Sequence, residues 1–322
     1  MSEIALRDVN KIPESEKMNE SSSNGKFTNA EEGQKKGTTS LVSGPVKTDE
    51  MENSGEVLAN SEVEYIESED LEDVEHVEDC LKTLLSGLGS KDWISVCDAL
   101  NNVRRLSVFH KEAIISMMAD VISLIVKSLK NPRSAVCKTA IMTCADIFKA
   151  YNDDTIDSVD PLLVQLLLKS SQDKKFVREA AESALIALTS SVSPLLLLPK
   201  LQPHIKNKNP RIRAKASSCI SRCVPRMGVE GIEAFGIEKL IQIGASQLSD
   251  QLPESRDSAR TLLLDLQSVY EKSHVLKQNI VSDEPVITAS WEHFCQSKLS
   301  PLSAQAVLRV TNTAREGLVI DS

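Results

Sequence analysis

Asn131-Pro132-Arg133-Ser134-Ala135-Val136-x-x-x-Ala140 is the stretch that decides the fold, because related sequences occur on both sides of it. A very similar copy is Asn209-Pro210-Arg211-Ile212-x-x-x-Ala216. Further copies, in decreasing order of similarity, begin at Asp173, Leu252 and Lys91. One short pattern is therefore repeated five times along the chain, which indicates a repeat architecture before any element is assigned.

The spacing of the copies predicts the type of repeat. Each copy contains an alanine, and these alanines are Ala99, Ala140, Ala181, Ala216 and Ala259, separated by 41, 41, 35 and 43 residues. Between the copies the apolar residues follow a helical period, as in the stripe formed by Val121, Ile122, Ile125, Val126 and Leu129. A period near 40 in a helical chain is typical of HEAT or armadillo repeats, which are stacked pairs of antiparallel helices.

Each copy also has the composition of a turn that opens a helix. Asn131, Asp173 and Asn209 are predicted helix N-caps, and Pro132 and Pro210 suit a first helical position. The small alanine then allows the two helices of a repeat to approach closely. We therefore predict an all-α, HEAT/armadillo-like solenoid of about five to six helical hairpins, with five clear units and a weaker sixth after Tyr270.

Charge divides the 322-residue chain into segments. The net charge is −9, but residues 1–79 contain 7 Lys/Arg and 21 Asp/Glu, whereas the remainder contains 30 and 25. Low hydrophobicity with like charge leaves little apolar surface to bury. We predict a disordered acidic arm over residues 1–70, the repeat domain over 71–275, and a C-terminal extension with short helices over 276–322. The arm is expected to be repelled by other acidic surfaces.

Several function classes are disfavoured by the sequence. Phosphate-binding glycine loops, His-Glu-x-x-His and nucleophile elbows are absent, so we expect no enzyme, no catalytic residues and no cofactor. Cys219 and Cys223 share a helix face but lack two further ligands, so no metal is expected. Aromatic residues make up 3% of the chain, which argues against nucleic acid, and apolar runs are too short for a membrane partner. The expected location is the cytoplasm.

The candidate binding surface lies on the intra-repeat turns, which line up along one edge of a solenoid. One aromatic residue and a series of basic residues fall there, namely Trp93, Arg133, Lys174, Lys175, Lys208, Arg211 and, less clearly, Arg256. Helix N-termini at the same turns favour anionic groups. An acidic protein surface would fit this edge. Arg178 and Arg213 are instead expected to pair with neighbouring carboxylates inside the solenoid.

These turns resemble those of the TOG domain, a HEAT-repeat module of microtubule regulators, and especially its CLASP and crescerin type. The resemblance covers roughly residues 75–275 and is carried by Ser90-Lys91-Asp92-Trp93, Asp173–Ala181 and Lys208–Arg213. The sequence differs from the family at Val96, where arginine is frequent.

The resemblance implies binding of the αβ-tubulin heterodimer, with a first-turn tryptophan against β-tubulin and later basic residues toward α-tubulin. Carried over by position, it implicates Trp93, Arg133, Lys174, Lys175, Lys208 and Arg211. It also implies a cytoskeletal location on microtubules. Two other interpretations remain open. One is a general HEAT scaffold for another acidic protein, in which Trp93 is a packed core residue, and the other is an importin-like transport adaptor.

Overall fold

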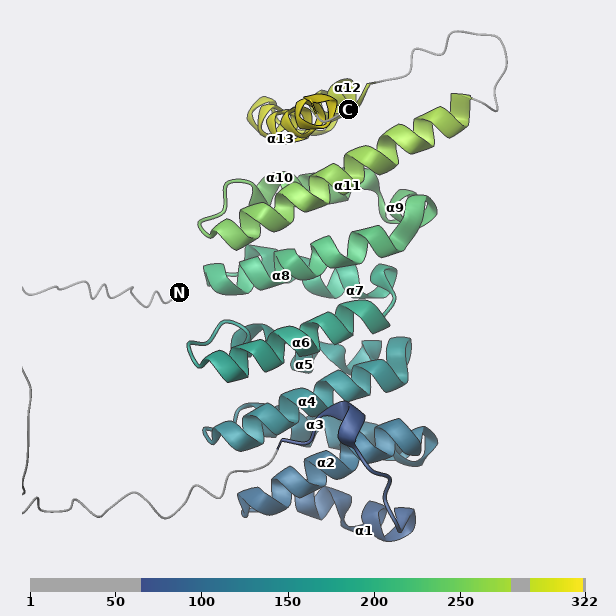
Figure 1. Cartoon of the computed structure of the whole chain (residues 1–322), viewed down its shortest axis with the longest axis vertical. Helices are drawn as coiled ribbons and strands as arrows, with labels where there is room; N and C mark the ends of the chain where they lie inside the picture. Colours follow the sequence, from purple (N-terminus) through teal and green to yellow (C-terminus); the bar gives the residue numbers. More distant parts are fainter. Residues whose placement is uncertain (1–64, 279–289, 321–322) are drawn as a thin grey trace, which may run out of the picture. The chain divides into compact units, whose positions relative to one another are not determined.

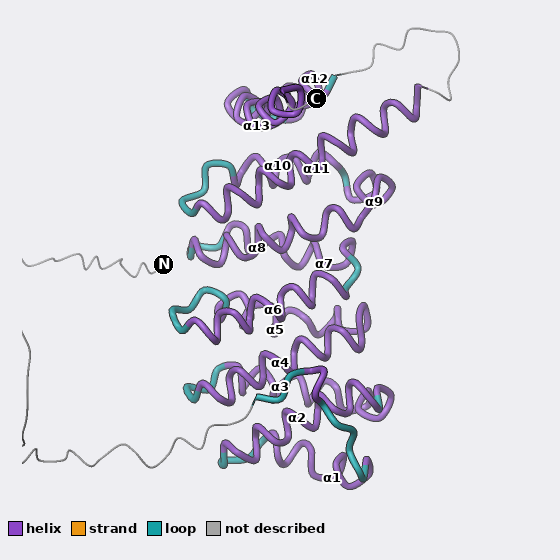
Figure 2. Tube along the Cα trace, in the orientation of Figure 1, coloured by secondary structure: helices purple, strands orange, loops and turns teal. Residues whose placement is uncertain are grey.

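The computed structural model describes residues 65–278 and 290–320, and within these ranges it contains helices and no strand (Figures 1 and 2). They belong to one compact unit, Asn60–Ser322. The helices are η1 (Ser68–Asp70), α1 (Val77–Leu88), α2 (Trp93–Phe109), η2 (Lys111–Met117), α3 (Met118–Leu129), α4 (Ser134–Tyr151), η3 (Asn152–Ser158), α5 (Val159–Lys169), α6 (Lys175–Ser191), α7 (Pro194–Leu201), η4 (Gln202–Lys206), α8 (Pro210–Cys223), η5 (Val224–Met227), α9 (Gly228–Phe235), α10 (Ile237–Gln247), α11 (Pro253–Gln278), α12 (Trp291–Lys298) and α13 (Pro301–Ile320).

Helical hairpins stack in chain order, which confirms the predicted solenoid. The pairs are α1–α2, α3–α4, α5–α6, α7–α8 and α10–α11, and the second helices lie side by side as α2, α4, α6, α8 and α11 (Figure 1). The five repeat alanines are all buried. A Cβ built on Gly87 of α1 would lie 2.9 Å from the Cβ of Ala99, so small residues on both helices permit the close approach.

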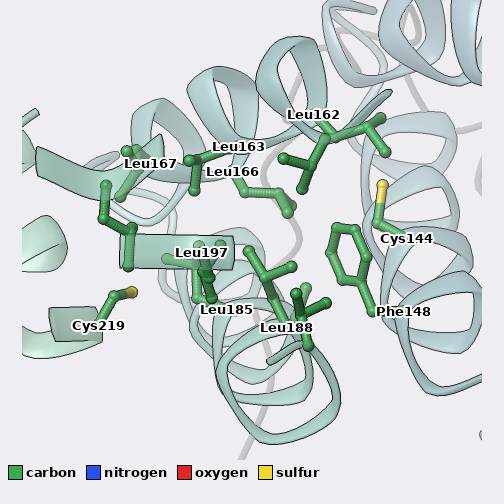
Figure 3. Close-up of a cluster of buried hydrophobic side chains, with 14 of the residues drawn as sticks. Cys144, Phe148, Leu162, Leu163, Leu166, Leu167, Leu185, Leu188, Leu197 and Cys219 are labelled. Atoms are coloured by element: carbon green, nitrogen blue, oxygen red, sulfur yellow. The ribbon is translucent and has the colours of Figure 1, made fainter. Parts of the chain in front are cut away.

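The core runs without interruption from one repeat to the next. Figure 3 shows Cys144 and Phe148 of α4 beside leucines of α5 and α6, and the same cluster continues to Leu197 of α7 and Cys219 of α8. These side chains are at most 1% exposed. Because each hairpin buries its apolar face on its neighbours, the repeats stabilise one another rather than folding as separate cores.

The turns match the predicted capping in part. Asn209 is the N-cap of α8, with Pro210 as the first helical residue, as predicted, and its Oδ1 accepts from the amide of Arg211 at 3.0 Å. Asn131 accepts in the same way from Arg133 at 2.9 Å, but α4 begins only at Ser134, so Asn131 and Pro132 belong to the turn. Asp173 is not a cap either, because α6 begins at Lys175 after Lys174.

A sixth hairpin follows Tyr270 in the chain, as predicted. It does not begin directly after that residue, because α11 continues to Gln278. The hairpin is formed by α12 and α13, of which α12 is short and α13 has 20 residues. The Tyr270 ring lies 5.4 Å from that of Trp291 and 4.8 Å from that of Phe294, so aromatic packing attaches this hairpin to α11.

Residues 65–76, here called the N-terminal strap, lie across α2 and α4 (Figure 1). The strap covers a buried ion pair in which Arg104 Nε donates to Asp146 Oδ2 at 2.7 Å. Arg104 also donates to the carbonyl of Ile66, and the Ser68 hydroxyl donates to Asp146 at 2.6 Å. The predicted arm lies outside the described residues up to residue 64, but its remaining part, residues 65–70, belongs to this packing.

We expect the strap to matter for stability, and two truncations separate it from the preceding residues. Deleting residues 1–64 should leave the free energy of unfolding unchanged. Deleting residues 1–70 removes the Ile66 carbonyl and the Ser68 hydroxyl from a buried ion pair and should cost about 2 kcal/mol or more. Urea denaturation measures both values, and equal stability of the two truncated proteins would show that the strap contributes nothing.

Candidate functional site

The intra-repeat turns and the first residues of the helices that follow them form a continuous surface, here called the turn edge. It comprises residues 89–93, 130–134, 170–175, 207–211 and 248–253. In Figure 2 these turns follow one another down the left side of the stacked hairpins. All six predicted site residues lie on it. Residues far apart in the sequence are therefore brought together as the repeat pattern predicted.

Trp93 is the first residue of α2 and is neither fully exposed nor part of the buried core. Its indole is half-buried against the core, and the Arg133 guanidinium lies over the ring, 4.7 Å from its centroid. Asp92 fixes this helix start by accepting from the amides of Ile94 and Ser95. Hydrogen bonds from the Ser95 hydroxyl and amide lower the pKa of Asp92, so this cap stays ionised well below neutral pH. Trp93 thus presents part of its ring from a fixed position.

Contacts between successive turns hold three of the basic residues in place. Arg133 covers Trp93 of the preceding turn, and Lys174 Nζ donates to the Ser134 hydroxyl at 2.9 Å. Arg211 donates to Asp173 at 2.9 Å and to the carbonyl of Ser171 at 3.0 Å. Each interaction joins one turn to the turn before it. The basic residues therefore follow one another along the turn edge in the order in which the repeats stack.

Lys175 and Lys208 extend further from the turn edge. The Lys175 side chain is 78% exposed and lies 3.7 Å from Glu179 on the same helix, while Lys208 is exposed in the turn before α8. From Lys130 to Arg211 the turn edge carries more cations than carboxylates. Exposed cations beside helix N-termini produce a positive potential, which attracts acidic surfaces and raises their rate of encounter.

Three other arginines play a structural part. Arg256 is the least clear of the edge candidates, and its Nη1 donates to the carbonyls of Asp250 and Gln251, so it closes its own turn. Arg178 makes the equivalent contacts to Gln172 and Asp173 carbonyls rather than to a carboxylate. Arg213 contacts turn carbonyls as well and pairs with Asp250 at 2.6 Å, as predicted. These arginines stay off the turn edge because of their position along the helix, and not because their charge differs from that of the edge residues.

Two exposed apolar residues on the turn edge or beside it were missed from the sequence. Ile94 follows Trp93 and is 48% exposed, and Phe176 follows Lys175 and is 42% exposed. A signal for Phe176 existed, because it falls outside the buried helical stripe formed by Val177, Ala181 and Ala184. Val96 lies in the buried core and cannot contact a partner from that position.

Other kinds of site find no support in the described residues. No group of three or more His, Cys, Asp or Glu side chains there is arranged to hold a metal. Burial raises the pKa of Cys219 to about 11, which disfavours the thiolate that zinc requires. Among the helices of residues 65–278 and 290–320, none combines the length and apolar character needed to cross a bilayer.

Comparison with known proteins gives a consistent picture. The family model described as CLASP N terminal matches residues 106–281. The chain is 24% identical over 208 residues to TOG array regulator of axonemal microtubules protein 1 of Mus musculus, covering 63% of this chain and 12% of the mouse protein. It is also 23% identical to the Crescerin-like protein che-12 of Caenorhabditis elegans, and this alignment covers 62% of this chain and 16% of the nematode protein. A solved TOG domain of C. elegans Zyg9 superposes with a TM-score of 0.51 and 17% identity, and the superposition covers 72% of this chain and 81% of the Zyg9 chain.

Proposed function

The chain belongs to the CLASP N-terminal family of TOG-domain proteins, and from this premise we propose that it binds αβ-tubulin through its turn edge and regulates microtubule organisation or dynamics. Trp93 would pack against one tubulin subunit, and the basic residues Arg133, Lys174, Lys175, Lys208 and Arg211 would reach toward the other. A protein of this family is not an enzyme, so its activity follows from binding.

The observation that carries the proposal is the pairing of Trp93 with Arg133 at the start of an aligned series of basic residues. A half-buried aromatic ring offers large apolar contact area at little entropic cost, which is the property of a binding hot spot. The scaffold alternative expects Trp93 in the core, whereas here it lies only half-buried at a helix start. Exposed Ile94 and Phe176 add apolar area near the cations.

The relatives align with this chain over only a small part of their own length, which limits what their function implies for it. The alignments span 12% and 16% of the mouse and nematode proteins, so the activity of those whole proteins is a proposal for this chain. The name of the mouse protein refers to axonemal microtubules, and crescerin is described as using a TOG domain array to regulate microtubules in the primary cilium. We propose microtubules as the location here, in the cytoplasm or in a cilium.

Gel filtration with soluble tubulin, alongside pelleting with taxol-stabilised microtubules, tests the proposal directly. Co-elution with tubulin is expected, since the turn edge offers a surface for the heterodimer rather than a lattice-binding tail. Elution of the two proteins at their separate positions, at concentrations of about 10 μM where even a weak specific complex forms, would contradict tubulin binding.

Reversing several basic residues at once should change the kinetics of binding. The triple variant Lys174→Glu, Lys175→Glu, Lys208→Glu is expected to lower the association rate about tenfold and to remove most of its salt dependence, because rim charges act mainly on encounter. Single neutralisations should cost only ~0.2–1 kcal/mol each. Stopped-flow mixing with tubulin over a range of salt measures both quantities.

The matched control reverses three exposed lysines away from the turn edge, Lys149, Lys239 and Lys272. It changes net charge by the same amount. If the control slowed association as much as the edge variant, overall charge and not the turn edge would steer tubulin.

A further inference from the structure

Ser68 is the strap hydroxyl that contacts the buried ion pair. Its Oγ donates to Asp146 Oδ1 at 2.6 Å, and Arg104 Nη2 lies 3.5 Å from the same oxygen. The Arg104 side chain is fully buried and that of Asp146 is 1% exposed, whereas Ser68 is partly exposed. The Ser68 proton therefore belongs to the network that closes the strap over this pair.

The surroundings of Ser68 in the strap are acidic and face solvent. Five carboxylates lie within five residues of it, and all are exposed, namely Glu67, Glu69, Asp70, Glu72 and Asp73. The backbone is extended at Glu67 and Leu71, on either side of the short helix η1. A serine kinase with a basic substrate groove selects a serine in such a segment by charge complementarity.

The strap can open without unfolding the repeats. Beyond the buried ion pair, its contacts include the Tyr65 ring under Lys138, the buried Leu71 side chain and the Asp73 carboxylate at His110. Segments with few buried contacts open locally at a smaller free-energy cost than the stacked core. An open strap presents its serine hydroxyl to an enzyme in solution.

A phosphate on Ser68 does not fit the closed strap. It replaces the proton that Ser68 donates to Asp146, and it carries about −2 charges at pH 7 beside a buried carboxylate. On its other side, Ser68 borders a cavity of about 330 Å³ between the strap, α4 and α6. Carboxylates outnumber amines among the charged groups that line this cavity, which are Glu67, Glu69, Glu179, Lys138 and Lys149. The phosphate is therefore repelled on both sides.

We propose that Ser68 is a phosphorylation site for an acidic-directed serine kinase, and that its phosphorylation releases the strap from α2 and α4. The γ-phosphoryl group of ATP moves to Ser68 Oγ. The bond between the γ-phosphorus and the oxygen of the ADP leaving group breaks, the phosphorus–Oγ bond forms, and the hydroxyl proton passes to a base of the kinase. Release uncovers the Arg104–Asp146 pair and opens the cavity to solvent. The proposal does not depend on tubulin binding.

The first experiment tests the site of modification. The full chain and a synthetic peptide of residues 65–76 are incubated with casein kinase 2, Mg²⁺ and ATP, and mass spectrometry locates the phosphate. We expect phosphate on Ser68 in both, more slowly in the full chain because the strap must open first. A peptide that takes up no phosphate, or a full chain that takes up none at Ser68 when the peptide does, would overturn the assignment.

The second experiment tests release of the strap. Phosphoserine is incorporated at position 68 of the full chain during translation, and hydrogen exchange is compared with that of the wild type and of Ser68→Ala. The amides of residues 66–72 should exchange tenfold or more faster than in the wild type, since a hydrogen bond to a buried charge is lost. They should also exchange faster than in Ser68→Ala, which loses the hydroxyl without gaining charge. Exchange in α5 and α7 should stay unchanged.

The matched control places phosphoserine at exposed Ser123 on α3, which adds the same charge outside the strap. Its strap should exchange as in the wild type. If the phosphoserine at position 68 exchanged no faster than Ser68→Ala, the phosphate would not be the cause of release. If the Ser123 control accelerated exchange in the strap equally, net charge and not the position beside Asp146 would be responsible. Either result would overturn the proposal.

Discussion

Replacing Trp93 by alanine is expected to weaken tubulin binding roughly thirtyfold or more, because a buried aromatic anchor at an interface is worth ~2 kcal/mol or more. The variant also frees the Arg133 guanidinium, which now lies over the indole ring. Since Trp93 is only half-buried, its loss should lower stability by less than the ~3–5 kcal/mol of a fully buried tryptophan. Tubulin titration and thermal melting of the same sample measure both effects.

The second tryptophan of the chain supplies the control. Trp291 is 5% exposed and packs on Tyr270 at the far end of the repeats. Trp291→Ala should therefore cost stability at about the buried-residue value while the folded protein binds tubulin normally. A Trp93→Ala protein that melts far lower than wild type, or that melts normally and binds tubulin as before, would remove Trp93 from the interface.

Replacing Asp146 by alanine is expected to destabilise the fold by about 3–5 kcal/mol, because it leaves the buried charge of Arg104 without its partner. Both side chains of this pair are at most 1% exposed. Loss of the carboxylate also removes the acceptor of the Ser68 hydroxyl, so the strap loses one of its attachments. Chemical denaturation gives the change in unfolding free energy.

Two further variants make this prediction specific. Asp160→Ala removes the partner of Lys200 in an ion pair that also joins two repeats but is about half-exposed, and it should cost under about 1 kcal/mol. The double variant Arg104→Met, Asp146→Leu replaces both charges and should recover much of the lost stability. Equal costs for Asp146→Ala and Asp160→Ala would mean that burial does not decide the contribution of this pair.

Much of the fold was predictable because every repeat of a solenoid has the same local structure, a pair of helices joined by a short turn. The copies around Ala140 and Ala216 indicated the hairpins, the alignment of turns and the all-α class, since each depends on short-range patterns. The cap at Asn209 followed for the same reason. Helix starts at Ser134 and Lys175 were shifted from their predicted positions, because turn length varies between repeats while the side-chain contacts stay similar.

The strap and the contacts of most single arginines were not predictable from the sequence, although the pairing of Arg213 with a carboxylate was. Tyr65 and Ile66 lie in a strongly acidic run, and Arg104 stands in a polar stretch that suggests a surface helix. Only the stacking of α2 on α4 brings Asp146 to Arg104 across 42 residues. Arg211 and Arg256 likewise lie at similar turns. Arg211 contacts Asp173 of the preceding turn, whereas Arg256 contacts the Asp250 carbonyl of its own turn.

Hydrogen exchange of the full chain with and without αβ-tubulin is the most direct test of the central claim, that the turn edge is the tubulin-binding surface. We expect slowed exchange in the backbone around Trp93, Arg133, Lys174 and Lys208, with little change in α3, α5 and α7. A stable complex in which α3, α5 or α7 is protected and the turn edge exchanges as in the free protein would contradict it.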